Sequence, residues 1–142
     1  MTKATHRVFG LVATVAVIAA LVWGFVIIGS PETRRIEKLD ERRLSDLRAI
    51  VRETRYLVYD PVKGQRRRDV FDDLESLNAS ARRNKLHLVD PETGEPYGYR
   101  VLAPAQYELC ATFSMARDSE HDVFWNHPPG RHCWTIDVAG AP

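Results

Sequence analysis

Two cysteines, Cys110 and Cys133, are the side chains in this sequence best suited to chemistry. A thiolate is a nucleophile and a metal ligand, whereas two thiols held together in an oxidising compartment form a disulfide. Two cysteines are too few for a disulfide-rich scaffold, so the even pair favours a single bridge. The alternative is that each cysteine is a free thiol packed as a small core residue.

The residues around each cysteine alternate between polar and apolar, which is typical of half-buried strands. Cys110 and Cys133 both fall on the polar face of their strands, opposite the apolar residues. If the two strands are neighbours, the cysteines face each other at a separation that a disulfide can bridge. We therefore predict a Cys110–Cys133 disulfide, which would close a loop of about 24 residues and contribute roughly 3 kcal/mol.

Three histidines, His121, His127 and His132, form with Cys133 the other group that has metal-ligand chemistry. Zinc accepts such ligands, but their spacing matches no compact motif and Cys133 is already assigned to the disulfide. A Cys–His nucleophile needs a free thiolate, which a disulfide removes. The sequence contains no haem-attachment motif, no phosphate-binding glycine-rich loop and no His-Glu-x-x-His. We expect no catalytic residue, no metal and no cofactor.

An apolar run, Val8–Ile28, precedes all of these residues and contains no charged residue and no proline. A helix of this length spans on the order of 30 Å, the thickness of the hydrocarbon core of a bilayer. We assign residues 1–7 to a polar leader and 8–29 to a transmembrane anchor. A cleavable signal peptide is the alternative, but the run is long for one and lacks a clear cleavage site. Its small residues would allow a second helix to approach, or would simply face lipid.

Two rules predict opposite orientations for this anchor. Lysine and arginine are more numerous just after the anchor than before it, which favours that side being cytoplasmic. A cysteine pair, however, favours an oxidising compartment. We expect the N-terminus to be cytoplasmic and residues 30–142 to be periplasmic.

Residues 30–142 are predicted to form one α+β domain. A long amphipathic helix is expected over 30–58, where Ser30 caps, Pro31 begins the helix and apolar residues recur at three-and-four spacing. A short helix capped by Asp69 is expected over 69–80, after a basic loop around Gly64. An antiparallel sheet of three to four strands is expected over 86–138, with a first strand at 86–89 and a tight turn at 90–94.

Charge and aromatic residues suggest surfaces for partners. The net charge of +1 gives no indication of nucleic-acid binding. Arg66, Arg67 and Arg68 form one basic cluster, and Arg82, Arg83 and Lys85 form another. Such clusters are solvated loop charge or contacts for lipid headgroups or an acidic partner. Phe124 and Trp125 lie in a long loop, where they either pack locally or contact a partner.

The stretch DPETGEPYGYRVLAPAQYELCATF, residues 90–113, resembles a motif of uncharacterised bacterial single-pass membrane proteins, in which a histidine and a second cysteine follow, as His132 and Cys133 do here. More loosely, the whole plan is similar to type II secretion pseudopilins and type IV pilins. That resemblance implies an apolar helix, an amphipathic helix and a small antiparallel sheet. No glutamate follows Gly10 at the position that prepilin processing needs, so the resemblance implies the fold rather than assembly into a pilus.

Together these patterns predict a non-catalytic, single-pass protein of the bacterial inner membrane. We expect a structural or accessory subunit of a larger membrane complex, of the secretion or bioenergetic and photosynthetic type, with lipid and other membrane subunits as partners. A membrane-tethered ligand-binding or sensor module is the alternative, and it requires a pocket with convergent polar groups. A metal- or thiol-dependent enzyme would require a reduced Cys133 close to a histidine.

Overall fold

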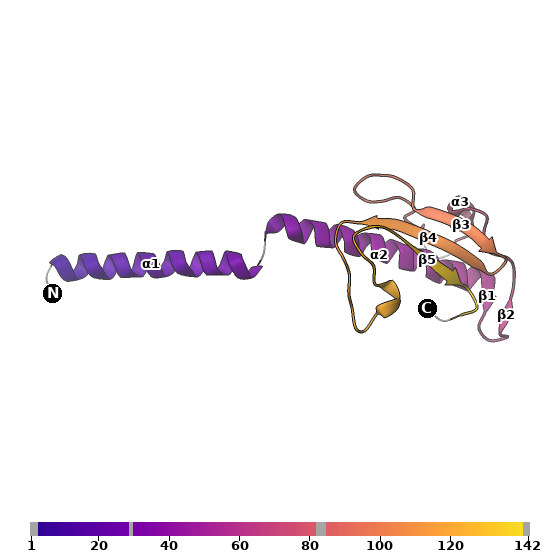
Figure 1. Cartoon of the computed structure of the whole chain (residues 1–142), viewed down its shortest axis with the longest axis horizontal. Coiled ribbons are helices and arrows are strands. Elements are labelled where there is room, and N and C mark those ends of the chain that lie inside the picture. The colour runs from indigo at the N-terminus through magenta and orange to yellow at the C-terminus, as the bar shows by residue number, and fades with distance from the viewer. Residues whose placement is uncertain (1–2, 29, 82–84, 141–142) are drawn as a thin grey trace. The chain divides into compact units, whose positions relative to one another are not determined.

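A computed structural model describes residues 3–28, 30–81 and 85–140, except for the side chains of residues 3–7 and 25–28. The chain divides into two compact units, residues 1–35 and 36–142, each described here by itself. The elements (Figure 1) are, in chain order, α1 (Lys3–Ile28), α2 (Pro31–Val58), β1 (Tyr59–Asp60), β2 (Gln65–Arg66), α3 (Leu74–Ser80), β3 (Gly98–Ala103), β4 (Gln106–Phe113), the 3-10 turn η1 (Val123–Trp125) and β5 (Gly130–Asp137).

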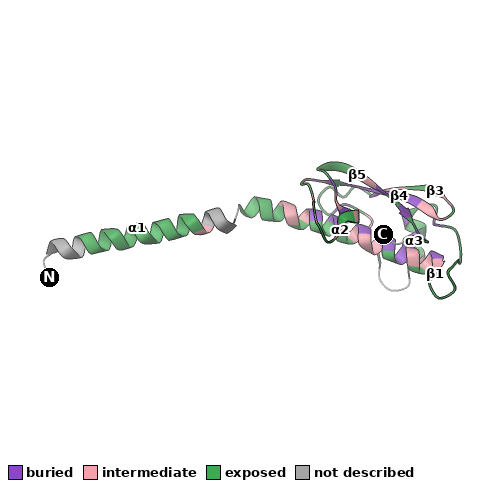
Figure 2. Ribbon diagram, turned by 60° about the horizontal axis from the view of Figure 1, so that its bottom comes forward, coloured by how far each residue is buried: buried purple, intermediate pink, exposed green. Residues whose placement is uncertain are grey.

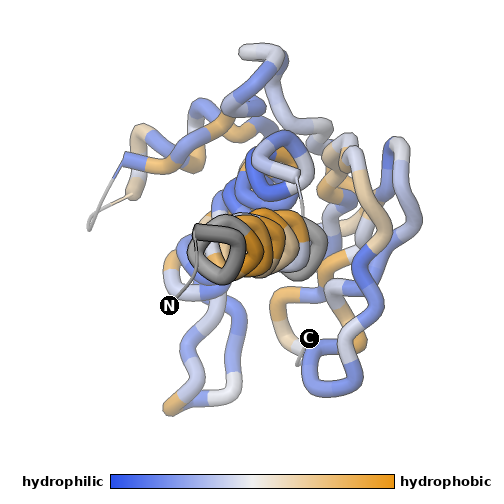
Figure 3. The backbone as a smooth tube through the Cα atoms, turned by 90° about the vertical axis from the view of Figure 1, so that its left-hand side faces the viewer, coloured by the Kyte–Doolittle hydropathy of each residue, from blue (hydrophilic) through white to orange (hydrophobic). Residues whose placement is uncertain are grey.

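Helix α1 contains the apolar run, and its described side chains are almost all exposed. Phe9 is 74% exposed and Trp23 is 71% exposed. Figure 3 shows the helix as predominantly hydrophobic. Over the described parts of the chain, no helix combines the length and the apolar character that a bilayer crossing requires. The predicted transmembrane anchor at 8–29 is therefore not confirmed, and residues 1–2 and 29 lie outside the described residues.

Helix α2 confirms the prediction for residues 30–58, including its cap. The Ser30 hydroxyl accepts a hydrogen bond from the Thr33 amide at 3.2 Å, and Pro31 is the first helical residue, where its missing N–H costs nothing. Only one face of the helix is buried (Figure 2). The apolar residues of that face within the second unit are Leu44, Leu47, Ile50, Val51 and Val58.

The sheet is antiparallel and contains three strands in the order β3–β4–β5. The predicted first strand at 86–89 is wrong: Val89 makes only an isolated bridge with Pro96. The Leu86 amide instead donates to the Asn78 side chain at 2.8 Å, and the turn that follows uses the backbone groups of Asp90. A second, two-stranded sheet, β1–β2, replaces the predicted basic loop around Gly64, whose φ of 62° suits the hairpin turn.

Helix α3 is shorter than predicted, because Asp73 rather than Asp69 caps it. The Asp73 carboxylate accepts a hydrogen bond from the Ser76 amide at 2.7 Å. Asp69 is paired with Arg66 at 3.2 Å, and the Val70 amide bonds to the Pro104 carbonyl at 3.1 Å. Residues 69–73 thus lie outside regular secondary structure, and the helix begins at Leu74.

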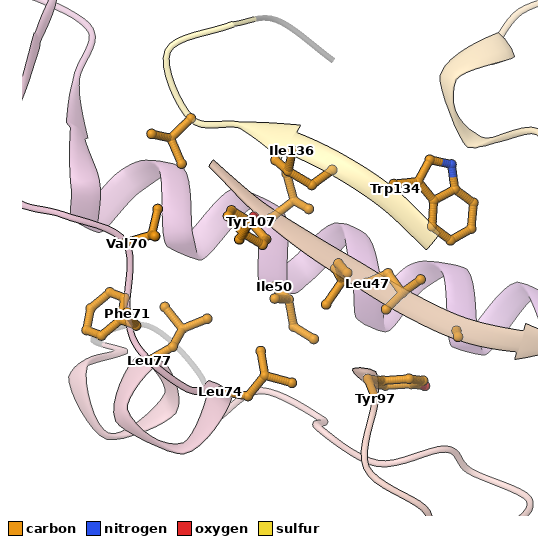
Figure 4. Close-up of a cluster of buried hydrophobic side chains, with 14 of the residues drawn as sticks. Leu47, Ile50, Val70, Phe71, Leu74, Leu77, Tyr97, Tyr107, Trp134 and Ile136 are labelled. Carbon is orange, nitrogen blue, oxygen red and sulfur yellow. The ribbon is translucent and has the colours of Figure 1, made fainter. Parts of the chain in front are cut away.

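The hydrophobic core lies between α2, α3 and the inner face of the sheet (Figure 4). Five aromatic residues fall on the apolar side of the polar–apolar alternation in and beside the strands. Four of them are buried and Tyr99 is half-buried; the four are Tyr97, Tyr107, Phe113 and Trp134. The period-two pattern therefore identified the inner face of the sheet correctly. Burial of each large aromatic side chain contributes on the order of 2–3 kcal/mol.

Three core tyrosines differ in what their hydroxyl groups bond. The Tyr97 hydroxyl donates to Asp46 at 3.1 Å and the Tyr99 hydroxyl to the Phe71 carbonyl at 2.7 Å. The Tyr107 hydroxyl is buried next to the Thr54 side chain, but it makes no well-formed hydrogen bond within the described residues. An unpaired buried hydroxyl costs about 1–3 kcal/mol, so its removal is favourable.

We expect Tyr107→Phe to leave the free energy of unfolding unchanged or raise it by up to about 1 kcal/mol, while Tyr97→Phe lowers it by about 1 kcal/mol. Urea titrations of the full chain, followed by circular dichroism, measure both variants. A loss greater than about 1.5 kcal/mol for Tyr107→Phe would show that its hydroxyl is hydrogen-bonded in solution.

Candidate functional site

Arg43 is the centre of a buried polar network on α2. Its side chain is 4% exposed and holds Asp90 with two nitrogens, Nε at 2.5 Å from Oδ2 and Nη2 at 3.1 Å from Oδ1. Nη1 lies 2.7 Å from the Asp40 carboxylate and Nη2 lies 2.7 Å from the Glu92 carboxylate. A planar guanidinium suits this bidentate geometry. The network therefore places one cation among three carboxylates.

The turn that supplies Asp90 is the one predicted at residues 90–94. Its carboxylate accepts hydrogen bonds from the Glu92 amide at 2.8 Å and the Thr93 amide at 3.0 Å, and Gly94 has a φ of 73°. Aspartate in this position stabilises such a turn by bonding to the backbone ahead of it. Asp90 thus stabilises the turn and, with the same carboxylate, pairs with Arg43.

Asp40 connects the same network to the end of β4. Its carboxylate accepts hydrogen bonds from the Ser114 amide at 3.1 Å and the Met115 amide at 2.8 Å, besides the bond from Arg43. The carboxylates of Asp40 and Asp90 are both engaged by Arg43 and by backbone amides. The arrangement is that of a clamp joining α2, the 90–94 turn and the chain after β4.

The electrostatics of the clamp favour its ionised form. Burial alone would raise the pKa of Asp90, but the bonds from Arg43 and from the Thr93 and Glu92 amides outweigh burial and lower that pKa to about 2. The hydrogen bond to Asp90 raises the pKa of Arg43 above its usual value, against the opposing effect of burial. Asp90 therefore stays charged throughout the range in which proteins are normally handled.

The low pKa of Asp90 predicts a loss of stability in acid. Because the folded-state pKa lies below the usual 3.8, the contribution is complete above about pH 5 and is lost as the pH falls towards 2. A shift of this size corresponds to about 2 kcal/mol. Urea midpoints of the wild type from pH 6 to pH 2.5 should fall more steeply than those of Asp90→Asn. Parallel curves would contradict the assignment.

The predicted disulfide is present: Cys110 and Cys133 are directly opposite each other on β4 and β5, with an S–S distance of 2.08 Å. Gly98 of β3 lies opposite Cys110, and a Cβ there would meet the Cys110 Cβ at 3.0 Å. A larger residue at that position would require the Cys110 side chain and the Arg131 guanidinium, which lies 3.1 Å from the same point, to shift by a few tenths of an ångström. Cys110 is buried although it lies on the outer face of the sheet.

The histidines do not form a site with Cys133. His127 is buried and stacks on Phe113 at 3.7 Å between ring centroids, and burial lowers the pKa of His127. The rings of His127 and His132 are 6.4 Å apart, while His121 is exposed. Among the described residues, the one group of three potential ligands within 4.8 Å is Glu108, Cys110 and Cys133, and its two sulfurs are bonded to each other.

Each arginine of the first basic cluster has an intramolecular contact. Arg66 is paired with Asp69 at 3.2 Å, Arg67 with Asp60 at 3.0 Å, and the Arg68 guanidinium lies 4.0 Å from the centre of the Phe71 ring. All three remain exposed, so contact with a partner stays a prediction. Of the second cluster, residues 82–84 lie outside the described residues.

The two loop aromatics predicted as possible contacts face inward to different degrees. Trp125 is 6% exposed and belongs to the core, with its ring 5.1 Å from that of Trp134. Phe124 is half-buried, and its carbonyl accepts a hydrogen bond from the Trp134 indole at 2.9 Å. These contacts agree with local packing, the first of the two interpretations.

Sequence reasoning missed both the clamp and a groove beside α2. The groove has a volume of about 590 Å³ and is lined by Arg48, Val51, Arg52, Arg55, Tyr56, Tyr59, Pro61, Trp125, Val138, Ala139 and Gly140. A signal for the clamp was available: Asp40 and Arg43 fall between Ile36 and Leu47 at helical spacing, where a charged residue must be buried with a partner. No comparable pattern in the sequence indicates that residues 138–140 lie beside α2.

No protein-family model, curated protein or solved structure shows significant similarity to this chain.

Proposed function

We propose that this protein is a non-catalytic, membrane-tethered subunit whose C-terminal domain docks onto other members of a larger membrane complex. The observation that carries the proposal is the contrast between the two units: an apolar helix with exposed side chains in one, and a closed hydrophobic core in the other. Large exposed apolar surfaces mark contacts with protein or lipid. In this proposal α1 supplies that contact.

Several features support the proposed location in a bacterial inner membrane with a periplasmic domain. The apolar run from Val8 to Ile28 contains no charge, and Lys3 and Arg7 precede it. The Cys110–Cys133 bridge is of the kind that persists in an oxidising compartment. The element order, with an apolar helix, an amphipathic helix and an antiparallel sheet, also agrees with the plan that the pseudopilin resemblance implies.

A second candidate function is a membrane-tethered ligand-binding module. The observation in its favour is the groove beside α2, whose volume of about 590 Å³ is in the range of small-molecule sites. This candidate and the first share the anchor and differ in what the domain binds.

The experiment is extraction of native membranes, first with alkaline carbonate and then with a mild detergent, followed by native-gel separation and mass spectrometry. We expect the chain to stay in the carbonate pellet and to migrate with other proteins at a fixed stoichiometry. Release by carbonate would overturn the anchor. Migration as a monomer or simple dimer would overturn the subunit and leave the ligand-binding module.

A charge-insertion variant tests whether retention in the carbonate pellet depends on the apolar run. Val15→Arg with Ile18→Arg places two charges in the middle of the apolar run, each costing about 2.5–3.5 kcal/mol in a bilayer. This variant should move to the carbonate supernatant. The matched control is Thr112→Arg, which adds a charge at an exposed position of β4 and should leave the chain in the pellet.

A further inference from the structure

We propose that the groove beside α2 binds a small organic anion with an apolar body, such as an aryl or short acyl carboxylate. This inference rests on the second candidate function, ligand binding, and not on membership of a complex. It assigns a ligand class to a surface formed by α2, the β1–β2 hairpin and the chain after β5.

Positive charge is concentrated on one wall of the groove. Arg48, Arg52 and Arg55 follow one another at spacings of four and three residues, which places them along one face of α2. Arg48 is already paired with Asp122 and lies 5.7 Å from the centre of the Trp125 ring. Its charge is therefore largely compensated within the domain.

The other two arginines lack such compensation. Arg52 is exposed, and its guanidinium is paired with no residue in the described part of the chain. Arg55 donates to the Gly140 carbonyl at 2.6 Å rather than to a carboxylate, and its Nε is buried without a partner among the described residues. Asp137 acts on Arg55 only as a more distant charge, beyond ion-pair distance. Two guanidinium groups are thus available to an anion at this wall.

The remaining lining is apolar and aromatic, and it includes no acidic residue. Val51 and Trp125 lie beside the arginines, and Tyr56, Tyr59 and Val138 complete the walls. An anion without an apolar body would leave the apolar lining in contact with water. A neutral apolar molecule would leave the two arginines without an anionic partner. The lining therefore complements a molecule that carries both parts. A volume of about 590 Å³ suits a single small molecule rather than a folded partner.

The test uses the full chain in an uncharged detergent and a matched pair of probes, 4-phenylbutyrate and 4-phenylbutanamide. The two probes share the same apolar body, and only the first carries a charge. Isothermal titration, with a detergent-only blank subtracted, should show saturable binding of one carboxylate per chain. We expect the carboxylate to bind roughly 10-fold more tightly than the amide, because a charge-assisted hydrogen bond exceeds a neutral one by about this factor.

Two arginine variants separate the groove from general surface charge. Arg52→Gln should weaken binding of the carboxylate by roughly 5–10-fold, while Arg42→Gln, which changes an exposed arginine on the same helix but outside the groove, should leave it unchanged. Arg52 is exposed, so this variant keeps the fold. Equal affinities for the two probes, absence of saturable binding, or equal effects of the two variants would each overturn the proposal.

An anionic lipid headgroup supplies the same chemistry as a free organic acid. Repeating the titration in micelles that contain phosphatidylglycerol distinguishes the two sources. Competition that disappears in Arg52→Gln identifies the lipid as a ligand of the groove, and unchanged carboxylate affinity identifies the free acid. The native-gel experiment is unaffected by either result, so failure of this proposal and failure of the subunit proposal are distinguishable.

Discussion

Arg43→Ala is expected to lower the free energy of unfolding by about 3–5 kcal/mol, the range for breaking a buried ion pair by removing one partner. The substitution leaves the carboxylates of Asp40 and Asp90 buried without their cation, and both retain only their backbone amide donors. The cost is the desolvation of uncompensated charge rather than the loss of apolar contact. Urea denaturation of the full chain at pH 7, followed by circular dichroism, measures it.

The neighbouring Arg42 provides the control for this prediction. It is exposed on the same helix, so Arg42→Ala should change the free energy of unfolding by no more than about 0.5 kcal/mol. Adding Asp90→Asn to Arg43→Ala should recover part of the loss, because it removes one of the stranded charges. If both arginine variants lose the same small amount of stability, the clamp does not stabilise the domain.

Loss of the Cys110–Cys133 bridge is the second large effect that we expect. The cysteines are 23 residues apart, and in the loop-closure account a bridge of this span stabilises the folded state by about 3 kcal/mol. The urea midpoint of the wild type should therefore fall when a reductant is added. The double variant Cys110→Ala/Cys133→Ala should start at the lower midpoint and show no response to the reductant.

The same pair of proteins tests the thiol chemistry that the sequence left open. A wild type whose midpoint is indifferent to reductant would show that the cysteines are not bridged in solution. Labelling of the unreduced wild type by a maleimide would show the same. Either result would restore Cys133 as a free thiol near His132 and reopen the enzymatic alternative.

Local patterns predicted the elements that are determined locally. The Ser30 cap, the apolar stripe of α2 and the 90–94 turn each depend on residues a few positions apart, and the structure confirms all three. The alternation of β4 and β5 also placed both cysteines on the same face, so that they could pair once the two strands proved to be neighbours.

Features that depend on distant contacts were not predictable in the same way. The first strand expected at 86–89 reads as a strand by composition, but its backbone amide at Leu86 bonds to Asn78 of α3 instead. Two aspartates precede α3 as possible caps, and only tertiary contacts of residues 69–71 decide between them. Arg48 and Arg55 of the groove resemble solvated charge on a polar helix, because the groups that they contact, Asp122 and the Gly140 carbonyl, come from distant parts of the chain.

The clamp affects the order in which segments of the domain can fold during synthesis. Arg43 meets Asp90 across 47 residues of chain, and Asp40 meets Ser114 across 74. Loops of this length cost entropy before any contact offsets it, which slows folding relative to a domain built from neighbouring segments. A chain emerging from the ribosome therefore cannot close the clamp until residue 114 has been made, and the core against α2 is not complete until β5 has followed. Synthesis halted before that point yields a target for chaperones and proteases rather than a smaller folded domain.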